Sequence, residues 1–309
     1  MFNKNSIKEI FGLDFDISFS PPKIESNLQS YIPKKDDSYF FDAEITKALL
    51  AGFAFNKRVL VYGLHGSGKS SHIEQIANRL AWPCVRVNLD GHIGRIDLIG
   101  RDVISLKDGK QITEFKQGIL PWAMEKGVAL IFDEYDAGRP EVMFVLQRVL
   151  ESEGKLTLSE ENRIIEPHPN FRLFATANTI GLGDETGLYH GTNMVNQGQL
   201  DRWNIIIHQD YIPVEKEIKM LLLKIPKMQK YSAELTKMVG FASLTRNAFK
   251  NGDLAVLVSP RTMISWCENL VIFGDLNLAL KFAFLNKCDA NDLNLIKEFY
   301  QRAFNRELE

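Results

Sequence analysis

The sequence predicts an α/β fold, a doubly wound parallel sheet with β-hairpin insertions, followed by an all-helical domain. Between residues 58 and 208, short apolar runs typical of buried strands alternate with stretches of helical spacing. A glycine-rich turn joins the first of these strands to the first helix, and after Pro213 only helical spacing remains. This alternation favours a parallel sheet, because each crossover between parallel strands needs a connecting segment, usually a helix.

The elements can be placed in order along the chain. Residues 1 to about 38 are expected to form a separate leader that contains proline-rich linker, and residues 10–13 are interpreted as a short docking element. Helical spacing covers residues 42–55. The alternating elements that follow are strand 58–62, helix 69–81, strand 84–88, a helix around 118–126, strand 128–132, helix 139–152, and strands 171–177 and 203–208.

Two insertions interrupt the alternation. Residues 103–114, with Asp108 and Gly109 at their centre, predict a β-hairpin. Residues 155–158 and 163–165 predict a second one. The helices expected after Pro213 lie at 214–224, 231–249, 260–273, 276–285 and 290–304. The chain is therefore expected to comprise a leader (1–38), an α/β domain (39–212) and a helical domain (213–309).

The turn after the first strand carries a phosphate-binding motif. Residues 63–70 read GLHGSGKS and match the P-loop pattern G-x-x-x-x-G-K-[ST]. Its glycines let backbone N–H groups point at phosphate oxygens, and the helix N-terminus adds a positive partial charge. Lys69 is expected to reach the β- and γ-phosphates and Ser70 to hold Mg²⁺. The residues expected to bind the nucleotide are Gly63, His65, Gly66, Ser67, Gly68, Lys69, Ser70 and Ser71.

A second element predicts hydrolysis. Asp133 and Glu134 follow the apolar run 127–132, at the strand end where open α/β sheets bind ligands. Asp133 is expected to complete the Mg²⁺ shell, mostly through water. Glu134 is placed to polarise an attacking water, with Asp136 as the next candidate. A kinase would not need the second carboxylate, so its presence favours nucleotide hydrolysis.

Composition restricts the compartment and the partners. The 309 residues are 45% hydrophobic and 25% charged, as in ordinary globular proteins. The net charge of −2 argues against broad nucleic-acid binding. Cys84, Cys267 and Cys288 form no C-x-x-C pattern, so three buried thiols in a reducing cytosol are expected. The first residues lack the order of a signal peptide, and the apolar run 48–55 is too short to span a bilayer. We therefore expect a cytoplasmic protein without a membrane partner.

These elements resemble AAA+ ATPases of the MoxR and chelatase branch, which carry hairpin insertions after the second and third strands. Within that branch they look like the CobS family, the ATPase subunits of aerobic cobaltochelatase. The likeness covers nearly the whole chain, and DEYDAGRP and GLYHG are its most specific motifs. The motifs are RVNLDGH (86–92), RIDLIG (95–100), GILPW (118–122), DEYDAGRP (133–140), FRLFATAN (171–178), GLYHG (187–191), QLDRWN (199–204) and SPRT (259–262).

The resemblance implies roles for further residues. Asn178, at the tip of the strand beside Asp133, is similar to an AAA+ sensor that orients the attacking water or senses the γ-phosphate; the alternative is a plain turn asparagine. Arg202 resembles the arginine finger that reaches the ATP of a neighbouring subunit; the alternative is a surface arginine paired with Asp201. Arg261, after the expected N-cap Ser259, resembles the sensor 2 arginine of the helical lid. Weaker candidates for contacts between subunits are Arg139 and Arg148, for which ordinary salt bridges are expected.

The resemblance also implies a biological role. Such subunits form hexameric rings and act with a CobT-like subunit and a large CobN-like subunit, which inserts Co²⁺ into hydrogenobyrinic acid a,c-diamide on the way to cobalamin. The corrin is not expected to bind here, and the six histidines form no i,i+3 or i,i+4 pair for cobalt. One alternative is a MoxR-type remodelling ATPase acting on a different client. Another, a nucleic-acid motor, is disfavoured by the acidic balance and the lack of a basic helix-turn-helix.

Overall fold

The computed structural model describes residues 2–151, 153–181 and 192–308. Its centre is a five-stranded parallel sheet with the strand order β2-β5-β8-β1-β9. The predicted parallel sheet is therefore confirmed, whereas the GLYHG motif at 187–191 lies outside the described residues. The strands are β1 (Val59–Tyr62), β2 (Cys84–Asn88), β5 (Ala129–Asp133), β8 (Arg172–Ala177) and β9 (Ile205–His208).

Helices cover this sheet close to where the sequence predicts them. The predicted boundaries agree with the observed ones within two residues. Several short helical segments were not predicted, since three to six residues are too few to show a helical period. Among the described residues of this part they are the 3₁₀-helices η1 (Ser26–Tyr31), η2 (Tyr135–Ala137) and η3 (Ser159–Glu161) and the helices α4 (Arg95–Ile99) and α7 (Gln197–Leu200). The predicted helices of this part are α2 (Ala43–Phe55), α3 (Lys69–Arg79), α5 (Ile119–Lys126) and α6 (Pro140–Leu150).

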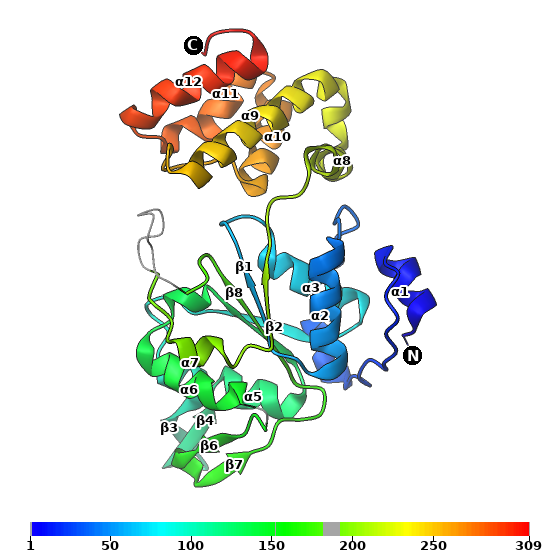
Figure 1. Cartoon of the computed structure of the whole chain (residues 1–309). Helices are drawn as coiled ribbons and strands as arrows, with labels where there is room; N and C mark the ends of the chain where they lie inside the picture. Colours follow the sequence, from blue (N-terminus) through cyan, green and yellow to red (C-terminus); the bar gives the residue numbers. More distant parts are fainter. Residues whose placement is uncertain (1, 152, 182–191, 309) are drawn as a thin grey trace.

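Both predicted hairpins are present. β3 (Gly100–Lys107) pairs with β4 (Lys110–Gln117), and β6 (Leu156–Leu158) pairs with β7 (Arg163–Ile165). The two hairpins lie together at the end of the α/β part farthest from the C-terminal helices (Figure 1). Ile104 and Leu106 are 74% and 75% exposed on the first hairpin.

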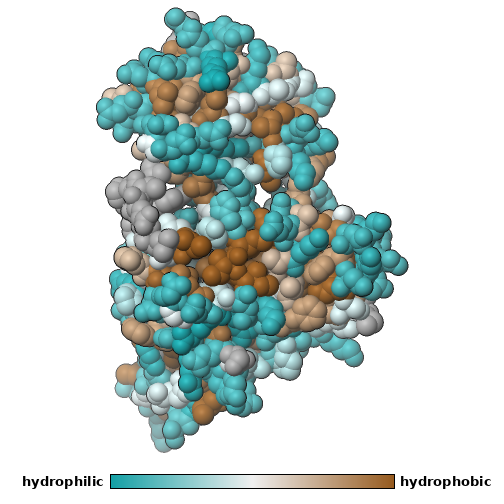
Figure 2. Space-filling view, in the orientation of Figure 1, coloured by the Kyte–Doolittle hydropathy of each residue, from teal (hydrophilic) through white to brown (hydrophobic). Residues whose placement is uncertain are grey.

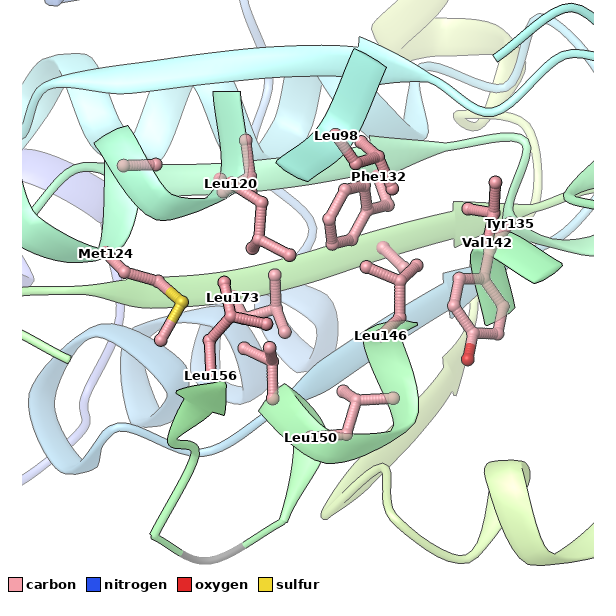
Figure 3. Close-up of a cluster of buried hydrophobic side chains, with 14 of the residues drawn as sticks. Leu98, Leu120, Met124, Phe132, Tyr135, Val142, Leu146, Leu150, Leu156 and Leu173 are labelled. Atoms are coloured by element: carbon pink, nitrogen blue, oxygen red, sulfur yellow. The ribbon is translucent and has the colours of Figure 1, made fainter. Parts of the chain in front are cut away.

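One hydrophobic cluster joins the hairpins to the sheet. Figure 3 shows Leu120 and Met124 of α5, Phe132 of β5 and Leu146 of α6 in this cluster, with Leu156 at the base of the second hairpin. All of these side chains are buried. The insertions are therefore anchored in the core of the α/β part.

The N-terminal segment is not separate from the α/β part, contrary to the prediction. Helix α1 (Lys4–Phe11) lies beside α2 in Figure 1. Its residues Ile7 and Phe11 are buried in one cluster with Leu49 of α2 and Ile73 of α3. The prolines in this segment suggested a linker, but its spaced apolar residues cover the outer side of α2 and α3.

The C-terminal helical unit, residues 214–304, has its own core. Trp266, Phe241 and Tyr300 are buried there, and Arg246 forms a buried two-pronged ion pair with Glu217. In Figure 2 hydrophilic residues dominate the outer surface of this unit, while an apolar area covers the middle of the α/β part. Its helices are α8 (Val214–Lys224), α9 (Ser232–Asn251), α10 (Pro260–Phe273), α11 (Leu276–Ala283) and α12 (Ala290–Phe304).

The three cysteines are free thiols. Cys267 is buried as expected, whereas Cys84 and Cys288 are only partly buried, which corrects the prediction of three buried thiols. Burial raises the pKa of the Cys267 thiol to about 12. Within the described residues, no helix is long and apolar enough to cross a membrane.

Candidate active site

The P-loop runs between β1 and α3 and adopts a backbone that needs glycine. Gly63, Gly66 and Gly68 all have positive φ angles. A Cβ atom on Gly63 would lie 2.1 Å from the backbone oxygen of Gln209, and one on Gly66 would lie 2.7 Å from Cβ of Ser259. The loop is therefore packed tightly between the chain after β9 and the start of α10.

Lys69 is held inside this loop. Its Nζ donates to the carbonyl oxygens of Gly63 (2.7 Å) and Leu64 (3.0 Å) and to Oδ1 of Asn178 (3.1 Å). Burial lowers the pKa of Lys69 to about 8, and the nearby charges of Asp133, Asp136 and Glu134 oppose this shift. The ammonium group is thus directed toward the turn whose N–H groups would cradle phosphates.

Asp133, at the end of β5, contacts side chains from three neighbouring elements. Its Oδ1 accepts from the hydroxyl of Ser70 on α3 (2.6 Å) and from the hydroxyl of Thr176 on β8. Its Oδ2 contacts the guanidinium of Arg86 on β2. Sequence reasoning missed Thr176 and Arg86, although each is a polar residue inside an otherwise mostly apolar strand, and that was the available signal.

The oxygen atoms of Ser70 and Asp133 fit a magnesium ion bound together with a nucleotide. Mg²⁺ prefers oxygen ligands and usually takes only one or two from the protein, with phosphates and water completing the shell. In the described part of the chain, no group of three or more His, Cys, Asp or Glu side chains could hold a metal ion. The residues therefore suit a metal shared with phosphates better than a dedicated protein metal centre.

Glu134 and Asp136 differ in exposure and in partners. Glu134 has a left-handed backbone (φ 56°) and is exposed beside the P-loop. Asp136 is 1% exposed, and its Oδ2 accepts from the N–H groups of Asn178 (3.0 Å) and Thr179 (2.8 Å) and from the Thr179 hydroxyl. Asp136 thus fixes the tip of β8, and its position does not suit it as the alternative base.

One pocket collects most of the predicted site residues. Ser259 caps α10 by accepting from the Thr262 N–H, as predicted, and the helix start brings Arg261 to the pocket. Gly63, at the start of the loop, lines neither this pocket nor an adjoining one, which Ser67 lines. The predicted residues that line the first pocket are His65, Gly66, Gly68, Lys69, Ser70, Ser71, Asp133, Glu134, Asn178 and Arg261.

The adjoining pocket is more apolar. It shares Gly66, Gly68, Ser71 and Arg261 with the first pocket. Its other walls come from the segment before α2, from the linker to the helical unit, and from α8 and α10. The side chains that give it an apolar character are Tyr39, Phe40, Ile212, Met220 and Ile264. None of these was predicted, because they come from segments far apart in the sequence.

The linker after β9 is hydrogen-bonded to the P-loop. Nε2 of Gln209 donates to the Ser67 carbonyl and the Tyr211 hydroxyl donates to the His65 carbonyl, both at 2.8 Å. The guanidinium of Arg246 on α9 lies 4.6 Å from the centre of the Tyr211 ring. This chain of contacts connects the P-loop to the helical unit.

Arg202 lies outside both pockets. It lines a different, polar pocket with Arg58 and Glu151, and its ion pair among the described residues is with Glu151 (3.7 Å) rather than with Asp201. Its guanidinium also donates to the Gly198 carbonyl. Arg139 and Arg148 form exposed salt bridges with Glu141 and Glu151, both at 3.8 Å.

Comparison with known proteins identifies the family. Residues 58–189 match the family described as AAA domain (dynein-related subfamily). The chain is 57% identical over 305 residues to aerobic cobaltochelatase subunit CobS of Sinorhizobium sp. These residues cover 98% of this chain and 91% of that protein. The chain belongs to the CobS family.

More distant relatives share parts of the chain. Midasin of Dictyostelium discoideum is 33% identical over 166 residues, which cover 54% of this chain and 3% of midasin. Among solved structures, the RuvB Holliday junction branch migration motor of Thermotoga maritima has a TM-score of 0.48 and 17% identity, covering 81% of this chain and 72% of that one. As a member of the CobS family with an AAA domain, the chain is a nucleotide-binding AAA+ ATPase.

Proposed function

We propose that the chain is the ATP-hydrolysing motor subunit of an aerobic cobaltochelatase, which drives insertion of Co²⁺ into hydrogenobyrinic acid a,c-diamide in cobalamin biosynthesis. The observation that carries this proposal is the identity of 57% to a CobS protein over 98% of the chain. The pocket between the P-loop, the end of β5 and α10 supplies the residues that such a motor needs.

The phosphates of ATP bind to the P-loop in this proposal. Lys69 exchanges its hydrogen bonds to the carbonyls of Gly63 and Leu64 for hydrogen bonds to the β- and γ-phosphates. The phosphates are the stronger partners, because these hydrogen bonds join opposite charges. Ser70 and Asp133 hold Mg²⁺, which would neutralise negative charge on the phosphate oxygens. The adenine occupies the adjoining pocket, where Tyr39, Ile212 and Ile264 offer apolar surface next to the P-loop.

Hydrolysis requires an oriented water molecule. Glu134 accepts a proton from this water, since its carboxylate is exposed at the pocket while that of Asp136 is not. Asn178 orients the water or contacts the γ-phosphate, and Asp136 keeps Asn178 in place through its backbone N–H. General-base catalysis by such a residue contributes about 10²- to 10⁴-fold.

The helical unit acts as a lid on the nucleotide. Arg261 reaches the γ-phosphate from the first turn of α10, and its guanidinium suits phosphate because it is always charged and can donate two parallel hydrogen bonds. The contacts of Gln209 and Tyr211 with the P-loop make the linker the route by which phosphate occupancy changes the lid position.

We infer that Arg202 completes the site of a neighbouring subunit. It lies away from the pocket of its own chain, and its ion pair with Glu151 is partly exposed and long, so leaving it costs only about 0–1 kcal/mol. The subunits would form a hexameric ring in the cytoplasm and work with CobT-like and CobN-like subunits. The exposed Ile104 and Leu106 of the first hairpin would be available for these partners.

Reconstitution tests the proposed function. The chain is combined with candidate CobT-like and CobN-like subunits, ATP, Co²⁺ and hydrogenobyrinic acid a,c-diamide, and the change in corrin absorbance is followed. Cobalt insertion that needs the parent chain and is lost with Glu134→Gln supports the proposal. ATP hydrolysis without any cobalt insertion, in a mixture where a known CobS supports it, would favour a remodelling ATPase with a different client.

A further inference from the structure

Asp133 is a buried carboxylate with both of its oxygens in contact with polar groups. It is 6% exposed, and the hydroxyl groups of Ser70 and Thr176 share Oδ1 while the guanidinium of Arg86 takes Oδ2. A buried carboxylate is costly unless a cation or several donors compensate its charge. Arg86 supplies that cation in the structure.

Arg86 is much freer to move than its partner. It comes from β2, the edge strand beside β5, and 43% of its side chain is exposed. It lines the same pocket as Lys69 and Ser70. The long arginine side chain can therefore leave Asp133 without unfolding any element, whereas Asp133 is fixed by the end of its strand.

A second carboxylate, Glu74, follows Ser70 by four residues on α3, so it lies on the same face of the helix as the hydroxyl that contacts Asp133, the partner of Arg86. Burial raises the pKa of Glu74 on α3, and the charge of Arg86 lowers it. In the part of the chain that the structure describes, Glu74 has no ion pair within 4.0 Å. Arg86 thus has an alternative carboxylate within its electrostatic reach.

We propose that Arg86 and Mg²⁺ compete for the Asp133 carboxylate, and that Glu74 is the alternative partner of Arg86. Both cations are attracted to the same side chain, and placing both on it would bring like charges together. Asp133 then always has a cation beside it, and Arg86 sets how much Mg²⁺ the site needs. This inference rests on the proposed nucleotide site and makes Arg86 a positioning residue for the metal ligand.

A magnesium titration tests the competition. Binding of a fluorescent ADP analogue is measured at increasing free Mg²⁺, and the half-saturating Mg²⁺ concentration is compared between variants. Mg²⁺ binds free nucleotide equally in every titration. A difference in the half-saturating Mg²⁺ concentration between two variants therefore comes from the protein. Arg86→Gln should lower the half-saturating concentration about tenfold, the size expected for losing one charge-assisted contact. The control Arg101→Gln, which removes the same charge from an exposed position on β3, should change it less than twofold.

Glu74 provides the opposite test. Glu74→Gln removes the alternative partner, so Arg86 should stay on Asp133 and the half-saturating Mg²⁺ concentration should rise. In the double variant this substitution should have less than a twofold effect, because it acts through Arg86. Additive effects in the double variant, or an unchanged value for Arg86→Gln, would overturn the inference. If Arg86→Gln does not fold, Glu74→Gln decides alone, and an unchanged or lower value overturns the inference.

Failure of this inference can be distinguished from failure of the proposed function. If the parent chain binds the ADP analogue only in the presence of Mg²⁺ but Arg86→Gln behaves like the parent, the nucleotide site stands and the competition does not. If the parent chain does not bind the analogue at any Mg²⁺ concentration, the nucleotide site itself is wrong, and the inference fails with it.

Discussion

At the scale of single residues, the site depends on charged groups that are held partly or fully out of water. Lys69 is 8% exposed, and three oxygen acceptors surround its ammonium group. Asp136 is buried as well, and it holds the backbone of Asn178 rather than a substrate. Of the three carboxylates Asp133, Glu134 and Asp136, Glu134 is the one that is exposed at the pocket. Burial therefore separates groups that look equivalent in the sequence.

The lowered pKa of Lys69 predicts that nucleotide affinity falls with pH. Phosphates bind the protonated ammonium, and Lys69 loses its proton as the pH rises through about 8. Phosphate groups, with a second pKa near 6, do not titrate in this range. ADP affinity should therefore fall by up to about 20-fold between pH 7.5 and 9.5. Calorimetric titrations would measure this; Lys69→Ala should bind weakly at every pH with a flat profile, and an equally steep fall in that variant would contradict the assignment.

The same shift has the opposite sign for folding stability. The pKa of Lys69 is lower in the folded chain than the usual 10.5, so between about pH 8 and 10.5 the unfolded chain binds more protons at this residue. The contribution of Lys69 to the free energy of unfolding therefore rises with pH in that window. Affinity and stability should change in opposite directions.

Glu134→Gln should keep ATP binding but nearly stop turnover. The amide cannot accept a proton from water, and general-base catalysis contributes about 10²- to 10⁴-fold. Steady-state ATPase assays with a parallel binding titration would measure this. Asp136→Asn, which keeps the shape of a buried side chain, is expected to lower thermal stability instead. Normal turnover in Glu134→Gln would move the catalytic role to another group.

At the scale of elements, long periodic segments and the glycine motif could be predicted from the sequence. The P-loop with its strand and helix, the strand β5 that ends at Asp133, and both hairpins are where the sequence indicates them. The contacts of Arg86 and Thr176 with Asp133 could not be predicted, because they depend on the strand order β2-β5-β8. The linker contacts of Gln209 were missed for the same reason, since nothing local in the sequence pairs residue 209 with the P-loop.

Two glycines with nearly the same backbone angle test how closely α10 must approach the P-loop. Gly66 has φ +73° and a Cβ there would lie 2.7 Å from Cβ of Ser259, whereas Gly109 has φ +74° and open space around it. Both alanine variants carry the cost of a left-handed residue, about 1–2 kcal/mol. Only Gly66→Ala should also push α10 away and weaken nucleotide binding. Thermal unfolding and ADP titrations would measure both effects, and equal losses of affinity in both variants would contradict this picture.

At the scale of the whole molecule, the fold places the P-loop residues and Arg202 in two different pockets of one chain. The pocket with Lys69 and Arg261 lies where the helical unit meets the α/β part, and Arg202 lies in a separate pocket beside Glu151. We therefore expect each active site of a ring to be completed by the next subunit. Arg202→Ala should still bind ATP but hydrolyse it slowly, and arginine fingers in related enzymes, worth about 10³- to 10⁵-fold, give an upper guide.

Mixing two inactive variants tests most directly whether the chain works as a ring ATPase with shared sites. Arg202→Ala has an intact Glu134, and Glu134→Gln has an intact Arg202. In rings formed at random from equal amounts, about a quarter of the interfaces pair an intact Glu134 with an intact arginine of the neighbour. ATPase activity should then partly return on mixing, under conditions where labelled parent rings exchange subunits. If exchange is demonstrated and mixing restores no activity, Arg202 does not act on a neighbouring site, and the account of shared sites is wrong.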